Sequence, residues 1–293
     1  TSHKTNYNGN YGLNASWTLY NGSKRLNTIE QEKLNNRIAK LDVATSENSI
    51  QESITQTYVQ ILYAAEAVKV NENTLKVSEA QRDRGKELLA AGSIAKSDLA
   101  QLEAQCSTDK YQLVTAQATL QDYKLQLKQL LELDGEEEMQ LTLPQLVDAD
   151  VLSPLPGKSE VYKSALVLRP EIEASRLSVE TSKLDIDIAR SGYRPNISLS
   201  AGIGTNHTTG SDFTFSEQVK NGWNNSIGVT LSVPIFNNRQ TKSSIQKAKL
   251  QQQSSQLELQ NQQKILFKTI EGLWLDANSA QQQYAAATEK LRS

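Results

Sequence analysis

The stretch GLNASWTLYNGSKRLNTIEQEKL, residues 12–34, returns 216 residues later as GVTLSVPIFNNRQTKSSIQKAKL, residues 228–250. Six of the 23 aligned positions are identical, and the same order of features recurs: an alternating strand, an aromatic residue, an Asn-centred turn and a helix start. A repeat has to be recognised before a fold is assigned, because it defines the unit from which the fold is built. We therefore expect two halves that share a strand–turn–helix plan.

Three segments alternate apolar and small polar residues with a period of two, which is typical of a strand with one apolar face. They span residues 12–20, 196–204 and 226–236. The apolar positions are Leu13, Ala15, Trp17 and Leu19, then Ile197, Leu199, Ala201 and Ile203, and finally Ile227, Val229, Leu231, Val233 and Ile235. Alternation alone fits an ordinary half-buried sheet as well as a lipid-facing strand. Residues 1–11 and 205–224 read as loops.

The helical pattern of the first half predicts a long hairpin. No proline or glycine occurs between Ser23 and Gly85, so we expect a helix over residues 23–88 that is about 90–100 Å long. Gly92 can adopt the left-handed conformation that ends this helix. Ser97 can cap a second helix over residues 97–132, with Asp98 at its positive end. Heptad-spaced apolar seams on both helices indicate antiparallel packing.

The second half repeats this plan after a connector. Residues 133–158 contain three of the six prolines and the acidic run Glu136–Glu138, with one short strand expected at Gln140–Leu143. Helical pattern resumes over residues 159–192, and Pro170 marks a new helix start. A final helix is expected over residues 240–292. The chain therefore divides into a first repeat (1–132), a connector (133–158) and a second repeat (159–293).

The composition excludes several classes of function. The formal net charge of −2 gives no basic field for nucleic acid. One cysteine and two histidines cannot build a zinc site or a His-based catalytic cluster, and we expect no cofactor, metal or enzymatic activity. No apolar run approaches a membrane-spanning helix. The chain opens on Thr1 and shows no signal peptide, so we interpret it as a fragment or processed product.

The attachment of strands to helices favours a tube over a globule. Each strand at the repeat passes directly into a helix far longer than a globular domain needs. The small polar residues on the second strand face would then line a wet lumen, and the apolar residues would face lipid.

With these features, the sequence resembles the outer-membrane efflux duct family, the TolC-like proteins. The resemblance rests on the duplicated strand–turn–helix and on three motifs: AAGSIAKSDLAQLEAQ (90–105), LRPEIEASRLSVETSKLDIDIARSGYRPNISLSAGIG (168–204) and SVPIFNNRQTKSSIQKAKL (232–250). It implies a mainly α fold with a small β part, in which long antiparallel helical hairpins are continuous with outer-membrane β-barrel strands and the plan is internally duplicated.

The resemblance also implies a function and partners. The full-length protein would be a homotrimeric, passive export conduit in the outer membrane of a Gram-negative bacterium, with a periplasmic extension gated at its helical tip. Its partners would be a periplasmic membrane-fusion adaptor, an inner-membrane pump and outer-membrane lipid, with no nucleic acid. Residues 133–158 would form an equatorial band.

Three sets of residues receive roles from this resemblance. The adaptor-contacting tip would be Gly92, Ser93, Ile94, Ala95, Lys96, Ser97 and Asp98. The lipid-facing strand positions would be Leu13, Ala15, Trp17, Leu19, Ile197, Leu199, Ala201, Ile203, Val229, Leu231, Val233 and Ile235. The strand–helix junctions would be Asn21, Gly22, Pro195, Pro234, Asn237 and Asn238.

An alternative stays open, namely a soluble coiled-coil scaffold or adaptor without a transport pore. The duplicated strand–helix junction argues against it, because a hairpin adaptor needs no second copy. A single residue also keeps two interpretations. Asp109 at a seam position either fixes helix register or faces the lumen, or else breaks the packing locally. Tyr11 and Trp223, near the predicted strand ends, fit an interfacial aromatic belt.

Overall fold

The structure, a computed structural model, describes residues 7–133, 141–142 and 151–292. The chain forms two compact units, one of residues 1–42 and 155–280 and the other of residues 43–154 and 281–293. Two long helices, α1 (Lys24–Ala90) and α7 (Gln240–Arg292), run through both units. With 67 residues, α1 is about 100 Å long.

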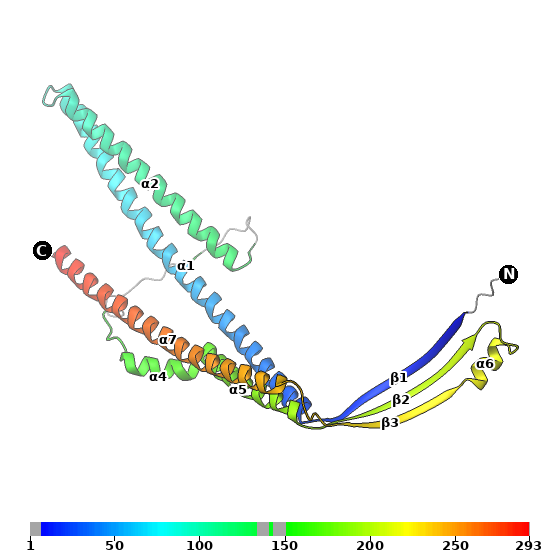
Figure 1. Ribbon diagram of the computed structural model, residues 1–293. Coiled ribbons are helices and arrows are strands. Elements are labelled where there is room, and N and C mark those ends of the chain that lie inside the picture. Colours follow the sequence, from blue (N-terminus) through cyan, green and yellow to red (C-terminus); the bar gives the residue numbers. More distant parts are fainter. Residues whose placement is uncertain (1–6, 134–140, 143–150, 293) are drawn as a thin grey trace. The chain divides into compact units, whose positions relative to one another are not determined.

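The first unit carries a three-stranded antiparallel sheet in the order β1-β2-β3 (Figure 1). Its strands are β1 (Asn8–Asn21), β2 (Asn196–Thr208) and β3 (Asn224–Ser232). The central strand β2 pairs with both neighbours, so β1 and β3 form the two edges of the sheet. The loops expected over residues 8–11 and 205–208 are wrong, because strand pairing extends through them.

The connection between β2 and β3 is also not a loop throughout, as a short helix, α6 (Phe215–Asn221), interrupts it. Thr214 caps this helix, and Glu217 completes a capping box with it. A Thr followed three residues later by Glu is a helix-start signal, so the sequence contained the information that could have located α6.

Helix α5 (Pro170–Arg190) forms the core of the first unit. Its buried residues are Pro170, Ile172, Ala174, Leu177, Val179, Ser182 and Ile186. Buried residues on more than one side of a helix indicate neighbours on more than one side. On the α1 side Gln31 Nε2 donates to Asp185 Oδ1 at 2.6 Å, and on the α7 side Thr241 is buried beside the end of α5.

A shorter helix, α4 (Lys158–Leu168), precedes α5 and packs on α7. The rings of Tyr162 and Phe267 meet edge to face at 5.4 Å. Lys158 pairs with Glu271 at 2.7 Å and lies over the ring of Trp274. As the sequence predicts, a new helix starts at Pro170, because the proline keeps Arg169 extended at ψ 120° and so separates α4 from α5.

The second unit contains the hairpin of α1 and α2 (Lys96–Leu130). Its buried seam includes Ile61, Ala64, Cys106, Asp109 and Leu127. Within the described ranges, no helix combines the length and apolarity that crossing a membrane requires. The connector prediction, including Glu136–Glu138 and most of Gln140–Leu143, lies outside the described residues, and Leu141 and Thr142 are not in a strand.

Candidate functional site

The two faces of the sheet differ in chemistry. Paired residues in neighbouring strands point to the same face, so the register sorts side chains into rows. One face is mainly apolar and carries the rows Leu13–Ile203–Asn225, Ala15–Ala201–Ile227, Trp17–Leu199–Val229 and Tyr20–Ile197–Leu231, in which Asn225 is the polar exception. The other carries Gly12–Gly204–Asn224, Asn14–Gly202–Ser226, Ser16–Ser200–Gly228, Thr18–Ser198–Thr230 and Asn21–Asn196–Ser232.

The apolar face is open to solvent in this chain. Leu13, Trp17 and Val229 are 70%, 65% and 69% exposed. Apolar side chains that are exposed in contiguous rows, rather than singly, mark a surface for contact with a protein or a membrane. The polar face holds glycines where neighbours leave no room: a Cβ on Gly202 would lie 2.7 Å from Asn14 Oδ1.

Three of the twelve predicted lipid-facing positions are not in these rows. The register shifts between Thr18 and Tyr20, so Leu19 has no partner and Tyr20 pairs with Ile197 instead. This is a β-bulge, in which one strand carries an extra residue. Val233 and Ile235 follow the end of β3 at Ser232, because Pro234 cannot donate a ladder hydrogen bond. The predicted strand 226–236 is therefore too long.

The two strand-to-helix junctions of the repeat share one backbone geometry. In the first, Gly22 and Ser23 have φ of 67° and 69°, and α1 begins at Lys24. In the second, Asn238 and Arg239 have φ of 49° and 63°, and α7 begins at Gln240. The offset of 216 residues seen in the sequence thus aligns two consecutive left-handed residues and both helix starts.

The Asn that opens each junction contacts the residue four positions later. Asn21 Oδ1 accepts the backbone N–H of Arg25 at 3.1 Å. Asn237 Nδ2 donates to Thr241 Oγ1. The repeat therefore has a physical cause, since the same Asn-anchored turn leads a strand into a helix twice.

A third junction, η1 (Ser191–Tyr193) between α5 and β2, interlocks with both. Arg194 Nη1 donates to the carbonyl oxygen of Gly22 at 2.9 Å, and a Cβ on Gly22 would lie 2.7 Å from Arg194 Cβ. A Cβ on Gly192 would lie 2.8 Å from Thr241 Oγ1, which donates to the Gly192 carbonyl oxygen. Glycine at positions 22 and 192 therefore allows the three helix–strand junctions to contact one another.

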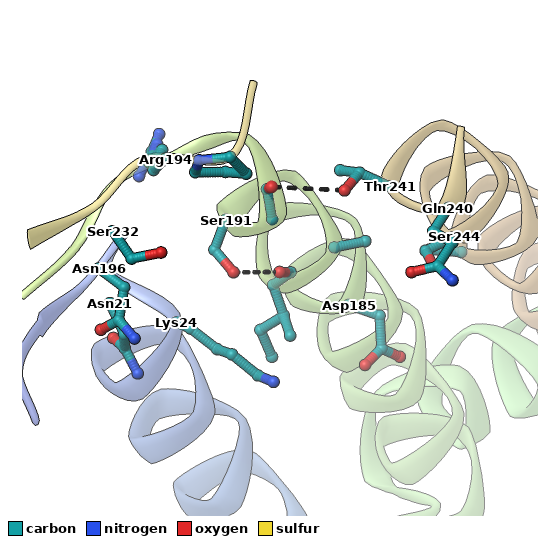
Figure 2. A pocket seen from close by; sticks show the side chains of 15 residues that line it. Asn21, Lys24, Asp185, Ser191, Arg194, Asn196, Ser232, Gln240, Thr241 and Ser244 are labelled. Atoms are coloured by element: carbon teal, nitrogen blue, oxygen red, sulfur yellow. Dashed lines mark hydrogen bonds between the residues drawn. The ribbon is translucent and has the colours of Figure 1, made fainter. Parts of the chain in front are cut away.

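The three junctions surround a cavity of about 650 Å³ (Figure 2). Its wall includes Asn21, Asn196 and Ser232, which form the last row of the polar sheet face. Lys24 and Asp185 lie across from this row, from α1 and α5. The polar face of the sheet therefore continues into the helical part of the first unit.

Of the predicted junction residues, Asn21, Gly22, Asn237 and Asn238 lie in the turns, and Pro195 and Pro234 lie at strand ends. Arg194, Gly192 and Thr241 were missed. Their contacts join positions about 50 to 170 residues apart, and no local pattern signals such a pair.

The hairpin tip lies between Ala90 and Lys96 in the second unit. Gly92 has φ of 74°, as predicted, and the N–H of Ser93 donates to the Leu88 carbonyl oxygen at 2.8 Å to close the turn. Open space surrounds Gly92. Within this loop Ile94 alone turns inward, toward Gly85.

The cap of α2 differs from the prediction. Ser97 lies inside the first turn, and the residue before the helix is Ala95, whose N–H donates to Asp98 Oδ2 at 3.1 Å. Asp98 fills this role because its carboxylate reaches back three residues to a backbone donor that the helix leaves free.

No cluster of metal ligands competes with these surfaces as a site. Among the described residues, no group of three or more His, Cys, Asp or Glu side chains is placed to hold a metal ion.

A sheet with one mainly apolar and one polar face is thus joined directly to helices of 67 and 53 residues. The sequence profile of the family described as outer membrane efflux protein matches residues 1–132 and 161–293. The chain belongs to the outer membrane efflux protein family and is an outer-membrane protein of Gram-negative type.

Individual relatives agree with this assignment. The chain is 25% identical over 284 residues to the cation efflux system protein CusC of Escherichia coli K12, covering 95% of this chain and 60% of CusC. It is 23% identical over 288 residues to the proteases secretion protein PrtF of Dickeya chrysanthemi, covering 95% and 59%. It thus spans about three fifths of the length of these curated relatives.

A crystal structure of CusC superimposes with a TM-score of 0.75 at 21% identity, over 97% of this chain and 70% of that one. The predicted fold class, a mainly α, TolC-like fold with a small β part, is confirmed, and the three described strands form an open sheet, not a closed barrel.

Proposed function

We propose that the full-length protein is the outer-membrane duct of a tripartite efflux or secretion system. It acts as a passive conduit, assembled as a homotrimer and gated at its periplasmic helical tip. CusC and PrtF carry names of a cation efflux system and of protease secretion, which supports an export role while assigning this protein no particular cargo.

The opposite chemistry of the two sheet faces carries the proposal. An outer-membrane strand needs alternate residues that face lipid and water. The apolar rows supply the lipid side, including Leu13, Trp17 and Val229. The polar rows contain only Gly, Asn, Ser and Thr, so the water-facing wall carries no charge that would trap a passing solute.

The edges of the sheet support assembly with further strands. The outer edges of β1 and β3 have no strand partner among the described residues. Backbone groups cannot stay unpaired inside a bilayer, and a closed barrel is the β-structure that satisfies them all. The remaining part of the protein and two further copies supply these strands.

The tip supports the proposed contact with an adaptor. Gly92, Ser93, Ala95, Lys96 and Ser97 are exposed, whereas the turn itself is held rigid by its backbone hydrogen bonds. A preformed loop binds without the entropy cost of ordering. No covalent chemistry is needed at this end, because opening requires only that adjacent tips move apart.

The molar mass of the detergent-extracted, full-length protein, measured by light scattering, tests the proposal. A trimer that needs detergent to stay in solution supports the duct. A protein that dissolves without detergent and is not trimeric would replace the duct with a coiled-coil scaffold.

A further inference from the structure

Helix α6 lies at the end of the sheet that is farthest from the long helices (Figure 1), and exposed aromatic side chains occur in and beside it. Five aromatic residues from β1, α6 and their flanks are between 54% and 69% exposed: Tyr7, Tyr11, Phe213, Phe215 and Trp223. Exposed aromatic residues gathered at one level indicate a surface that is neither fully wet nor fully apolar.

The cluster lies on the apolar side of the sheet. Phe215 contacts Tyr11 edge to face at 6.4 Å and the His207 ring at 4.8 Å. Tyr11 and His207 belong to the same alternation phase as the apolar residues Leu13 and Ile203. No aromatic residue occurs in the polar rows, so the cluster continues the apolar face.

Helix α6 also satisfies polar groups that lie beyond the apolar rows. Thr205 Oγ1 donates to the carbonyl oxygen of Val219 at 2.9 Å, and Gln218 Oε1 accepts the N–H of Thr208 at 2.8 Å. β3 pairs with β2 only as far as Gly204, so α6 occupies the edge of β2 that β3 leaves free. The helix is therefore fixed to the sheet and does not hang over its end.

The level of the cluster fits the boundary of a bilayer. Nine residue steps separate Tyr11 from Tyr20, which is the aromatic residue at the other end of the apolar face. At about 3.4 Å per step and a tilt of about 40°, they span roughly 23 Å of height, close to the ≈25 Å apolar band of outer-membrane barrels.

We propose that α6 and its aromatic neighbours form an anchor in the outer-leaflet interface, on the lipid side of the sheet, and are not a lid over the conduit. The partner is the lipid surface itself. Aromatic rings with polar edges favour the headgroup level, where one side of the ring is apolar and the other wet. This inference rests on the proposed function, because it takes the apolar rows to face lipid.

Site-specific fluorescence of the full-length protein in phosphatidylcholine vesicles tests the anchor. One cysteine is introduced into a background in which Cys106 and any other cysteine are replaced by serine, and it is labelled with an environment-sensitive dye. The three positions are Phe213→Cys beside α6, Val229→Cys in an apolar row and Thr230→Cys in a polar row. Nitroxides at the lipid headgroup, nitroxides at mid-chain and aqueous iodide serve as quenchers.

The expected pattern separates the anchor from the duct. The headgroup nitroxide should quench the dye at position 213 most strongly. The mid-chain nitroxide should quench the dye at position 229 most strongly, and iodide should do so at position 230. The anchor proposal is wrong, and the duct proposal is unaffected, if two results occur together. The dye at position 213 is quenched by iodide alone or most strongly by the mid-chain nitroxide, while the dye at position 229 is still quenched from the lipid. If 229 responds to iodide alone, the lipid-facing sheet is wrong and the anchor falls with it.

Discussion

At the residue scale, the first strand-to-helix junction depends on a glycine for two separate reasons. Gly22 combines a φ of 67° with close neighbours, whereas Gly92 at the tip has a φ of 74° and open surroundings. An alanine in the left-handed region costs about 1–2 kcal/mol, and overpacking adds about 1–3 kcal/mol. Gly22→Ala should therefore lower the free energy of unfolding clearly more than Gly92→Ala.

Denaturant unfolding of the detergent-purified full-length protein measures both variants. The atoms that crowd Gly22 are Arg194 Cβ and the Ser191 carbonyl oxygen, neither of which moves without its backbone. Equal losses for the two variants would show that the interlocked junction adds nothing beyond the backbone conformation.

Asp109 is the buried acid of the hairpin seam, with 4% exposure. Gln105 Nε2 donates a hydrogen bond to Asp109 Oδ1 at 2.8 Å, and no cation forms an ion pair with Asp109 among the described residues. An uncompensated buried charge is costly, so Asp109→Asn should slow hydrogen exchange in α2, with a gain of about 1 kcal/mol.

Asp122→Asn is the matched control, because Asp122 accepts from Gln126 Nε2 at the same 2.8 Å but is exposed. It should leave exchange in α2 unchanged. Faster exchange in Asp109→Asn would favour the role in helix register over the interpretation as a local packing defect.

At the element scale, α6 depends on its capping box. The N–H and the hydroxyl of Thr214 donate to Glu217 Oε2 at 2.9 and 2.8 Å, and these two bonds lower the pKa of Glu217 below its ordinary 4.5. Because the pKa of Glu217 is lowered in the folded state, its ionised carboxylate stabilises the helix above pH 4.5. This stabilisation is lost as the pH falls through the lowered pKa. The protection factors of the amides at residues 215–221, which correct for the intrinsic pH dependence of hydrogen exchange, should therefore fall in acid.

Thr214→Ala keeps the backbone N–H but removes the hydroxyl, which donates to Glu217 Oε2 and accepts the Glu217 N–H. It should therefore accelerate exchange of the same amides at neutral pH, by an amount corresponding to about 1 kcal/mol. Ser216→Ala, at an exposed position of the same helix, serves as the control and should leave them unchanged. Unchanged exchange in Thr214→Ala would mean that packing of Phe215 on the sheet, and not the cap, holds α6.

The elements were predictable where one period dominates the sequence. Alternation located β1, β2 and β3, the absence of glycine and proline before Gly85 located α1, and a periodic apolar seam located α7, because all three are local properties of the chain. The bulge at Leu19 and the end of β3 were not predicted, since they arise from pairing across strands and from one proline. The interlock of Gly22 with Arg194 has no local signal at all.

At the scale of the whole molecule, the repeat explains why so thin a core suffices. Each half couples one strand to one long helix through an Asn-anchored turn, and α5 alone is buried on several sides. Most of the remaining apolar surface stays exposed in this chain, including Leu250 and Leu257 on α7. Under the proposed function, a protein built this way would gain its missing burial through assembly and lipid.

The assignment of the two sheet faces leads to a prediction with adjacent residues. Val229 and Thr230 are neighbours in β3, yet Val229 lies in the apolar row with Leu199 and Thr230 in the polar row with Ser198. A lysine near the middle of a lipid-facing strand costs about 2–4 kcal/mol, whereas one in a water-filled lumen remains hydrated. Val229→Lys should therefore lower the amount of full-length trimer recovered from the outer membrane, whereas Thr230→Lys should assemble normally.

Thr230→Lys should instead alter the ion selectivity of single channels in planar bilayers toward anions, because copies of the charge would line the same lumen. Recovery of trimer from membranes and selectivity of the pore are independent measurements, so each variant is expected to change one of them only. Normal assembly of Val229→Lys together with loss of Thr230→Lys would invert the two faces. It would place the Gly, Asn, Ser and Thr rows against lipid, where their side chains have no water to bind.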